Sequence, residues 1–421
     1  MPFTSEEIRN LTRIALDQPP VWPIEDDSFK FTVEVKGTWD RPNYFYLWSW
    51  IDFDGDINWG DGVIETVSIR KRSGSYGYVH YYKESGIYQV KMDGIFLCFG
   101  GGIRGGTYSA RNLISVDSKI PKPNYNDFTI LFNGCSNLKK IHSRLFDNCS
   151  EVTNFQYCFS GCSSLVSIPA GLFNKCTKAS NFYACFYNCT SLTSIPSGLF
   201  SKCTRVNSFE SCFYNCSSLT SIPSGLFDNT SLATTFRRCF DNCSSLTSIP
   251  SGLFDNCTEA IDFGICFRRC SSLTSIPSGL FDNCAEVTTF RYCFRFCLSL
   301  TSIPSGLFSN CTEVTSFWSC FLNCPLLTSI PSGLFDNCAD VTTFENCFRG
   351  CSSLTSIPSG LFDNCTEVTN FRYCFGHDRN IISLVPDLWN THPNADGTNC
   401  YVMCYNAANY SIIPETWGGS A

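Results

Sequence analysis

The sequence predicts a two-part chain, a small β-sandwich followed by an α/β solenoid of about ten 27-residue coils. The string SIP recurs every 27 residues, with its Ile at 168, 195, 222, 249, 276, 303, 330 and 357. The 421 residues include 29 Cys and 37 Phe but only 16% charged residues, which an average domain does not show. Residues 28 to 97 instead alternate polar residues with β-branched and aromatic ones, the pattern of half-buried strands.

The fixed period divides the chain into four parts. Ile141 and Leu384 extend the series, so that the coils occupy about residues 112 to 390, and a strict period of this length is the signature of a solenoid. We expect an N-terminal helix or attachment arm at 1–27, the sandwich at 28–97, the solenoid at 98–390 and a capping unit at 391–421. In the capping unit Cys400 and Cys404 repeat the CxxxC spacing of the coils.

Each coil has its own predicted elements. Phe155, Cys158, Phe159 and Cys162 fall at i, i+3, i+4 and i+7, which predicts the buried stripe of a two-turn helix. The following SLTSI predicts a short strand ended by Pro. A second apolar group that includes Cys176 then leads into the next coil, and these five residues represent the structural core of a coil.

The repeat unit FRYCFYNCSSLTSIPSGLFDNCTEVTNF resembles the BspA-like leucine-rich repeat, in the variant found in bacterial surface proteins, Mycoplasma-type lipoproteins and phage-encoded proteins. The resemblance covers about two thirds of the chain. The chain departs from the common form in having Phe and Cys where many members have Met, and Pro after the strand. The resemblance implies a non-catalytic binding protein.

Twenty-six of the cysteines obey the repeat, in three columns. A disulfide framework, a metal array and a ladder of buried reduced thiols are the three interpretations. Where one column carries Thr230, the neighbouring Cys212, Cys216, Cys239 and Cys243 all remain. This favours the packing ladder, because a bonded partner or a zinc ligand would have been orphaned there.

The sandwich region resembles the polycystic-kidney-disease (PKD) type immunoglobulin-like domain through WGDG at 59–62 and through His80, Tyr82, Gly86, Tyr88 and Val90. We expect Trp59, Tyr82 and Tyr88 in its core, with Asp-Gly forming a hairpin turn. In that family the domain is a spacer or adhesion module.

The run DFDGD places three acidic side chains at alternate positions, Asp52, Asp54 and Asp56. This makes a weak calcium candidate, and a solvated turn is the simpler interpretation.

Other features restrict the function. The net charge of −7 argues against a nucleic-acid binder, and the longest apolar stretch is too short for a membrane span. No GxSxG, P-loop or HExxH motif occurs, so we expect neither enzymatic activity nor a cofactor. Residues 4 to 17 predict an amphipathic helix that docks either on another protein or on the sandwich, and the glycine-rich 100–106 predicts a flexible junction.

A binding surface is predicted where the repeats vary. The outward positions of the predicted helices collect Arg, Tyr and Trp, residue types enriched in recognition hot spots and carbohydrate contacts. A solvated face with unselected variation is the alternative interpretation. The predicted stripe is Tyr183, Tyr187, Tyr214, Arg237, Arg238, Arg268, Arg269, Arg291, Tyr292, Arg295, Trp318, Arg349, Arg372 and Tyr373.

The expected function is recognition without catalysis. We favour a bacteriophage virion component, a fibre, decoration or host-attachment protein, because the start MPFTSEEIRN lacks the apolar core of a secretory signal. Such a protein is assembled in the host cytoplasm, contacts other virion proteins through its N-terminal region and binds protein or carbohydrate on a cell surface. A homo-oligomer would be natural at a symmetric virion position. A bacterial cell-surface adhesin and an intracellular interaction scaffold are the alternatives.

Overall fold

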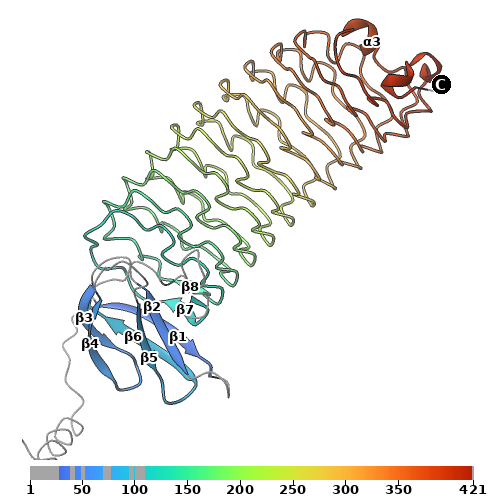
Figure 1. Ribbon diagram of the computed structural model, residues 1–421. Coiled ribbons are helices and arrows are strands. Elements are labelled where there is room, and N and C mark those ends of the chain that lie inside the picture. Colours follow the sequence, from blue (N-terminus) through green and yellow to red (C-terminus); the bar gives the residue numbers. More distant parts are fainter. Residues whose placement is uncertain are drawn as a thin grey trace, which may run out of the picture.

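The computed structural model describes residues 28–37, 43–48, 53–69, 77–93, 99 and 110–419. The predicted helix at 4–17, the glycine-rich 100–106, Asp52 and Cys98 lie outside the described residues. Figure 1 shows two small β-sheets at the N-terminal end and a long, curved solenoid of stacked coils beyond them.

Six strands form the N-terminal region: β1 (Phe29–Val35), β2 (Tyr44–Trp48), β3 (Phe53–Asn58), β4 (Ile64–Ile69), β5 (Gly77–Tyr81) and β6 (Gly86–Met92). They belong to two sheets: one pairs β2 with β5, and the other has the order β4-β3-β6-β1 and continues with β7 (Leu113–Val116) and β8 (Lys140–Ile141). The sheets pack on each other, since the Phe31 and Phe45 rings lie 5.9 Å apart. The predicted strands are thus present in two packed layers.

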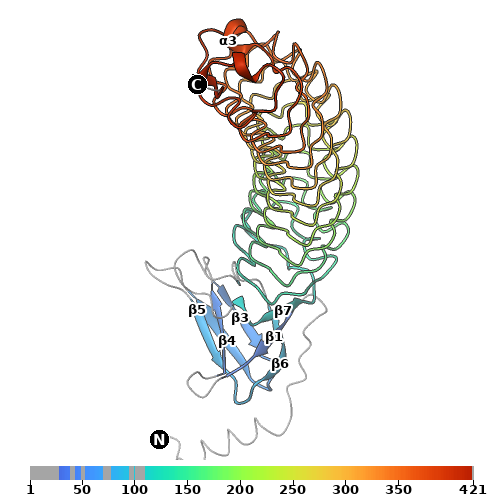
Figure 2. The same ribbon diagram turned by 90° about the vertical axis from the view of Figure 1, so that its right-hand side faces the viewer.

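The larger sheet runs directly into the solenoid. β7 (Leu113–Val116) pairs antiparallel with β1 and parallel with β8 (Lys140–Ile141), the first strand in register with the repeat. The Phe99 ring packs edge-on against Phe31 at 4.8 Å and stacks on Phe132 of the first coil at 5.4 Å. Figure 2 shows β7 between the sheets and the first coils. The N-terminal sheet therefore covers the open end of the solenoid.

The aromatic motif of the sandwich makes one internal network. Trp59 is fully buried, its ring stacks on His80 at 4.5 Å, and its indole N–H donates to Glu65 at 2.6 Å. His80 Nε2 lies 2.9 Å from Asp61 Oδ2. Tyr82 is buried as expected, but Tyr88 is only partly buried, because it lies on the outer side of the Tyr82 ring at 4.2 Å.

The predicted solvated turn at DFDGD is wrong, because its described part is strand β3. Asp54 and Asp56 pair with Ser68 and Thr66 of β4, and Asp56 accepts a hydrogen bond from the Thr66 hydroxyl at 2.5 Å.

The predicted two-turn helix is also wrong. Residues 155–162 form consecutive turns in which the Cys158 amide donates to the Phe155 carbonyl and the Cys162 amide to the Phe159 carbonyl. The third and seventh residues, Tyr157 and Gly161, have φ of 54° and 74°, which an α-helix excludes and which a type II turn requires at its third residue. We call these eight-residue segments the turn stack; they begin at Phe155, Phe182, Phe209, Phe236, Phe263, Phe290, Phe317, Phe344 and Phe371.

The backbone amides that form no hydrogen bond within the turns donate hydrogen bonds to the neighbouring coil. Phe155, Tyr157, Phe159 and Gly161 each donate to a carbonyl of the next coil, at 2.7–2.9 Å. The i, i+3, i+4, i+7 spacing of buried residues suits this arrangement as well as a helix, which explains the error. The solenoid is held together by backbone hydrogen bonds between coils.

The predicted SLTSI strand is reduced to single parallel bridges, such as Ser167 with Ser194 and Ser221 with Ser248. The continuous ladder lies just before the turn stack, where bridges run from Asp127 through Asn154 to Asp396. Asn, Ser, Thr and Asp occupy this column, and their side chains accept hydrogen bonds from the amide two residues on, as Asn154 does from Gln156.

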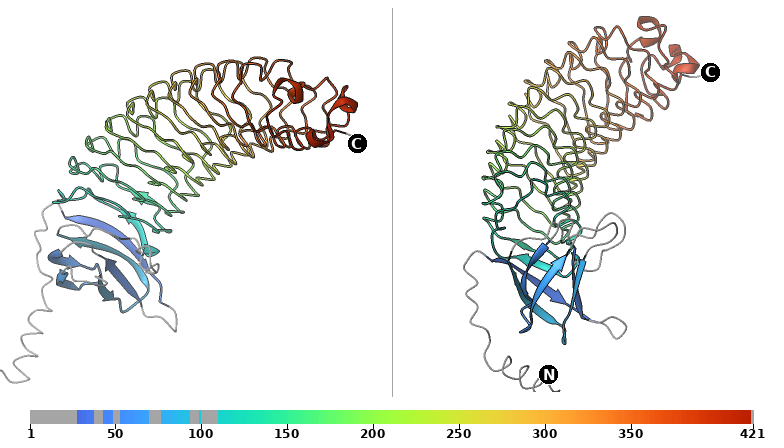
Figure 3. Two further views of the ribbon diagram at one scale, coloured as in Figure 1. Left: turned by 45° about the horizontal axis from the view of Figure 1, so that its top comes forward. Right: turned by 60° about the vertical axis from the view of Figure 1, so that its left-hand side comes forward.

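Columns of stacked phenylalanines fill the core. The column formed by Phe132 and the fifth residues of the turn stack, up to Phe375, has ring centroids 5.2–5.6 Å apart. The column from Phe146 to Phe362 has centroids 5.5–6.3 Å apart. Figure 3 shows that the stacked coils follow a curved arc.

The C-terminal end is closed by irregular structure. Tyr401 continues the Phe375 column at 5.9 Å, and its amide donates to the Trp417 carbonyl. The short elements here are α3 (Leu388–Thr391), η1 (Tyr410–Ile412) and η2 (Glu415–Trp417). Among the described residues, no helix has both the length and the apolar character needed to cross a membrane.

Candidate functional site: an arginine and aromatic surface on the turn stack

The turn stack presents four outward columns of side chains. Counted from the first Phe of each segment, they are the second, third, sixth and seventh positions, while Phe and Cys occupy the buried first, fourth, fifth and eighth. Successive members of a column belong to adjacent coils. The predicted stripe thus lies on one continuous surface, formed by turns rather than helices.

The seventh position has positive φ in every coil from Gly134 to Met403. Six of the nine segments carry Gly or Asn there, which tolerate this conformation, and the Asn side chains form a ladder: Asn215 donates to Asn188 at 2.8 Å and Asn242 to Asn215 at 2.6 Å. The next two coils break the ladder with Arg269 and Phe296, at φ of 59° and 61°. Further along the solenoid, the seventh position also departs from Gly and Asn at His377 and Met403, near the C-terminal end.

Arginine and aromatic side chains interleave across the same coils. The Arg291 guanidinium carbon lies 5.2 Å from the Trp318 ring centroid and 5.7 Å from that of Tyr292. Arg295 lies 4.7 Å from Phe296 and 5.1 Å from Tyr292. These distances are within the range of cation–π attraction, which holds the guanidinium groups in place.

Two arginines have buried Nε atoms with no hydrogen-bond partner among the described residues, Arg238 and Arg295. Burial lowers the pKa of Arg295, and the positive charges of Arg268 and Arg269 lower it further, against the opposing effect of Tyr292. This guanidinium is partly buried and lies among like charges, which favours the approach of an anion.

Arg268 has a different role. It holds the buried Asp241 with two hydrogen bonds, Nε to Oδ1 at 3.0 Å and an η nitrogen to Oδ2 at 2.7 Å. The Asp241 side chain is fully buried, so burial raises its pKa while Arg268 opposes the shift. Arg268 is therefore first of all the partner of this carboxylate.

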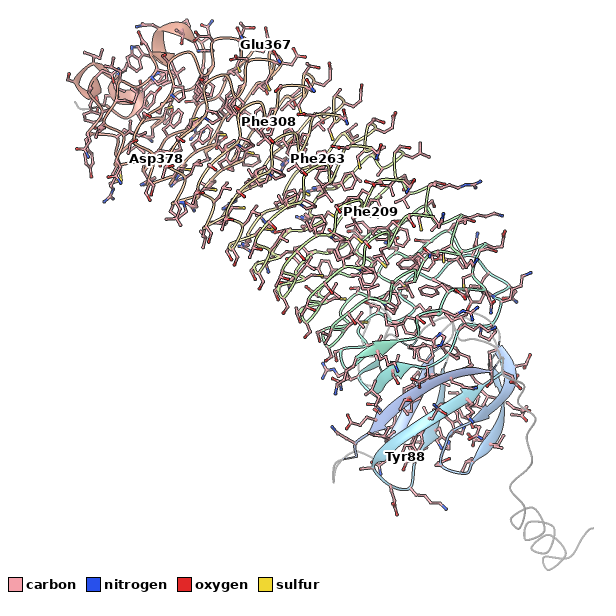
Figure 4. The ribbon with its side chains drawn as sticks, turned by 180° about the vertical axis from the view of Figure 1, so that it is seen from behind. Tyr88, Phe209, Phe263, Phe308, Glu367 and Asp378 are labelled. Carbon is pink, nitrogen blue, oxygen red and sulfur yellow. The ribbon has the colours of Figure 1, made fainter. Side chains whose placement is uncertain are left out.

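The charge of this surface is opposite to that of the whole chain. Three consecutive coils contribute six arginines, which we call the arginine cluster: Arg237, Arg238, Arg268, Arg269, Arg291 and Arg295. The carboxylates of Asp241 and Asp262 lie in the same coils and are counted with the cluster for its charge. Its formal charge is then +4, in a chain of net charge −7. The acidic residues gather in the GLFDNCTE segments on the far side of each coil. Figure 4 shows Glu367 of such a segment and Asp378 of the turn stack at opposite edges.

The remaining predicted residues lie on the same surface but outside the cluster. Tyr187 and Tyr214 stack at 4.4 Å on its N-terminal side, one coil after Tyr157 packs against Tyr183. Toward the C-terminus, Arg349 lies 4.8 Å from the Tyr373 ring, and Arg372 lies 3.6 Å from Asp396.

The predicted stripe does not include Asp241 or Phe296, although Phe296 is one of the outward residues beside Arg295. Both occur where a repeated residue type changes, and such breaks in a column could have identified them.

The cysteine columns lie behind this surface. The 28 described cysteines are all buried and form no disulfide. Cys162 Sγ donates to the Phe132 carbonyl at 3.3 Å, a contact repeated along the column. Burial raises the thiol pKa values, to about 12 at Cys149 and Cys203. Thr230 takes a cysteine slot by donating to Phe227 at 2.9 Å. This geometry agrees with the packing-ladder interpretation.

One cysteine slot holds a carboxyl group instead. Asp378 is fully buried, and neither of its oxygens has a hydrogen-bond partner among the described residues. The nearby Gly350 and Cys351 amides favour the ionised form, but both already donate to carbonyl groups. Burial therefore raises the pKa of Asp378 well above its usual range.

The described residues contain no group of three or more His, Cys, Asp or Glu side chains placed to hold a metal ion. The calcium candidate has two described members, Asp54 and Asp56, and the pairing of Asp56 with Thr66 is part of the β3–β4 hairpin.

Comparison with known proteins identifies the repeats. A family model described as a BspA type leucine-rich repeat region of six copies matches residues 125–259, 183–315 and 244–377, which together span well over half of the chain. A search of curated proteins finds no match. A solved structure titled "Crystal structure of TLR13-ssRNA13 complex" is similar over 60% of this chain and 55% of that chain, at 11% identity and a TM-score of 0.12, and this likeness carries no argument. The match to the repeat model shows that the chain belongs to the BspA type leucine-rich repeat family.

Proposed function

We propose that this protein is a non-catalytic recognition protein that binds its target through the arginine cluster of the turn stack. The observation that carries the proposal is the change at the seventh position, where Arg269 and Phe296 replace Gly or Asn although the backbone remains left-handed. Phe296 lies beside the guanidinium groups of Arg269 and Arg295, at 5.8 Å and 4.7 Å, and neither of these two arginines has a carboxylate partner among the described residues. Leucine-rich repeats of this kind serve in protein interaction and adhesion, and their curved surfaces suit extended contacts.

We also propose where the protein acts, as a bacteriophage virion component that is assembled in host cytoplasm and binds a cell-surface protein or glycan. The cysteine columns without disulfides support folding in a reducing compartment, and the resemblance of the repeats to phage-encoded ones supports the virion. Other virion proteins would then contact the N-terminal region, whose sequence resembles the PKD-type domain. A cell-surface adhesin and an intracellular scaffold are the alternatives. Mass spectrometry of purified phage particles tests this: absence of the chain from particles of a phage that encodes it would refute the virion assignment.

The binding surface is tested with two triple variants of the full chain. The first removes three cluster arginines that do not hold Asp241: Arg237→Ala, Arg269→Ala and Arg291→Ala. The second is a matched control that removes the same charge from exposed positions outside the turn stack: Lys175→Ala, Lys202→Ala and Arg205→Ala.

Adhesion of the fluorescently labelled chain to a panel of bacterial cells is the measurement. We expect the cluster variant to lose adhesion and the control to keep it, with melting temperatures checked for both. Equal adhesion of the cluster variant and the unaltered chain would refute the proposed surface.

A further inference from the structure

We propose that the arginine cluster binds a glycan that carries carboxylate groups, with Arg295 taking a carboxylate and the neighbouring rings contacting uncharged parts of the sugar chain. This rests on the proposed function and names the class of ligand for the same surface. Three features of the described residues support it: an internal carboxylate complex, the limited extent of the positive charge, and the absence of a free backbone edge.

The turn stack contains an internal arginine–carboxylate pair of the kind proposed for the ligand. Asp241 and Arg268 occupy the sixth position of two adjacent coils. Arg268 binds the Asp241 carboxylate through two N–H···O hydrogen bonds, the bidentate geometry that arginine prefers with carboxylates. Arg295 occupies the sixth position one coil further on. The sixth residue of the preceding coil is then Arg268, not an acid, so the carboxylate for Arg295 has to come from outside.

The environment of Arg295 prepares it for this role. Its guanidinium carbon lies within about 5 Å of two rings, those of Phe296 and Tyr292, which fix the side chain and exclude water from one side. Its Nε atom is buried without a partner. A group held in this way loses little conformational entropy when an anion binds.

The arginine cluster occupies three coils; of the later arginines on this surface, Arg349 shares its coil with Glu345 and Arg372 lies 3.6 Å from Asp396. In the second column, Glu210 precedes the cluster and Glu345 follows it, and Glu210 is an ion-pair partner of Arg237 at 3.7 Å. Uncharged rings flank the cluster: Tyr214, in the coil of Glu210, stacks on Tyr187 of the coil before it, and Trp318 lies in the coil between the cluster and Glu345. A nucleic acid, with a charge on every unit, would meet carboxylates at both ends, whereas a glycan with few acidic sugars fits this sequence of charge and rings.

An extended peptide is disfavoured by the backbone. Peptides that bind as an added strand need free N–H and C=O groups on the receptor. In the turn stack, the Arg269 amide donates to Arg295, and the Phe296 amide to Leu322. Side chains are thus the groups that this surface offers, and planar rings with charged forks suit sugar faces and carboxylates.

The test measures binding of the full chain to defined polymers. Polygalacturonate and polysialic acid are the carboxylated glycans, and fully methyl-esterified polygalacturonate has the same sugar chain without the charge. Dextran sulfate, polyglutamate and single-stranded oligo-dT represent the competing classes. The variants are Arg295→Gln, which removes charge and fork, Arg295→Lys, which keeps the charge, and the control Arg205→Gln; thermal unfolding checks each fold.

We expect binding to at least one carboxylated glycan, at least about tenfold weaker binding to the methyl ester, and a decrease in affinity with added NaCl. Arg295→Gln lowers the affinity about tenfold or more, and Arg295→Lys by less. Arg205→Gln leaves it unchanged.

The inference is overturned if neither carboxylated glycan binds, if the methyl ester binds equally well, or if the sulfate, peptide or nucleic-acid polymer binds more tightly. If these polymers fail while Arg237→Ala, Arg269→Ala and Arg291→Ala together still abolish cell adhesion, only the ligand class is wrong. If that triple variant adheres normally, the surface itself is wrong.

Discussion

Replacing Arg269 with Asn should stabilise the solenoid and weaken binding at the same time. Arg269 has φ of 59° in a column whose preceding members, Asn188, Asn215 and Asn242, form a side-chain ladder. A left-handed conformation costs most residues about 1–2 kcal/mol, and this conformational cost is smaller for Asn. The new amide would donate to Asn242 as Asn242 donates to Asn215, a gain of about 0.5–1.5 kcal/mol.

The stabilising contact that Arg269→Asn removes is weak. The Arg269 guanidinium carbon lies 5.8 Å from the Phe296 ring centroid, and an exposed cation–π contact is worth about 0.5–1 kcal/mol. The net expectation for Arg269→Asn is a gain of about 1 kcal/mol in the free energy of unfolding. Asn242→Arg is the reverse change one coil earlier and should destabilise the chain by a similar amount.

Urea unfolding followed by circular dichroism measures the change, and hydrogen exchange of peptides around residue 269 locates it. The same variants are compared in the adhesion assay. A lower stability of Arg269→Asn, or a higher stability of Asn242→Arg, would refute the argument that function is maintained here against backbone strain.

Three further outcomes follow. Asp378→Cys restores the cysteine column and should raise the free energy of unfolding at pH 7 by about 1–3 kcal/mol. Burial raises the pKa of Asp378 in the unaltered chain. The protonated Asp378 therefore contributes fully to the stability of the unaltered chain below about pH 4, and this contribution is lost as the pH rises through the folded-state pKa. The gain should therefore shrink in acid, and a gain independent of pH would count against the unpaired carboxyl. Arg268→Ala should destabilise the chain by about 3 kcal/mol, since it strands the buried Asp241, and adding Asp241→Ser should restore most of the loss; equal melting temperatures for the single and double variants would contradict this. The 28 described thiols should resist a thiol reagent at about pH 8 until the chain is denatured, as their burial and raised pKa values require, and mass spectrometry showing modification of these thiols in the folded chain would contradict the packing ladder.

The period and the buried columns could be predicted from the sequence, because each coil buries the same positions. The local conformation could not be predicted from apolar spacing alone, since residues at i, i+3, i+4 and i+7 also line two consecutive turns. Gly161, Asn188 and Asn215 at the seventh position were the better indicator, because a type II turn needs positive φ there. The Phe and Cys columns are compatible with either backbone.

The candidate site was predictable as a surface but not as a set of roles. Variation among the outward positions identified Arg268, Arg291 and Arg295 together. Only the structure separates Arg268, which holds Asp241, from Arg295, which has no carboxylate partner among the described residues. The different roles of Arg268 and Arg295 depend on contacts between side chains of adjacent coils, about 27 residues apart in the sequence. The sequence shows which residues occupy a column but not which of them are in contact.

Arginine footprinting tests the binding surface most directly. The full chain, free or bound to the cells or glycan it recognises, is treated with an arginine-selective dicarbonyl reagent, and each modified residue is quantified by mass spectrometry. Arg269 and Arg291 are exposed in the free chain, as are Arg144 and Arg205 outside the cluster. The account predicts that binding protects Arg269 and Arg291 and leaves Arg144 and Arg205 reactive. Undiminished modification of Arg269 and Arg291 in the bound chain would contradict it.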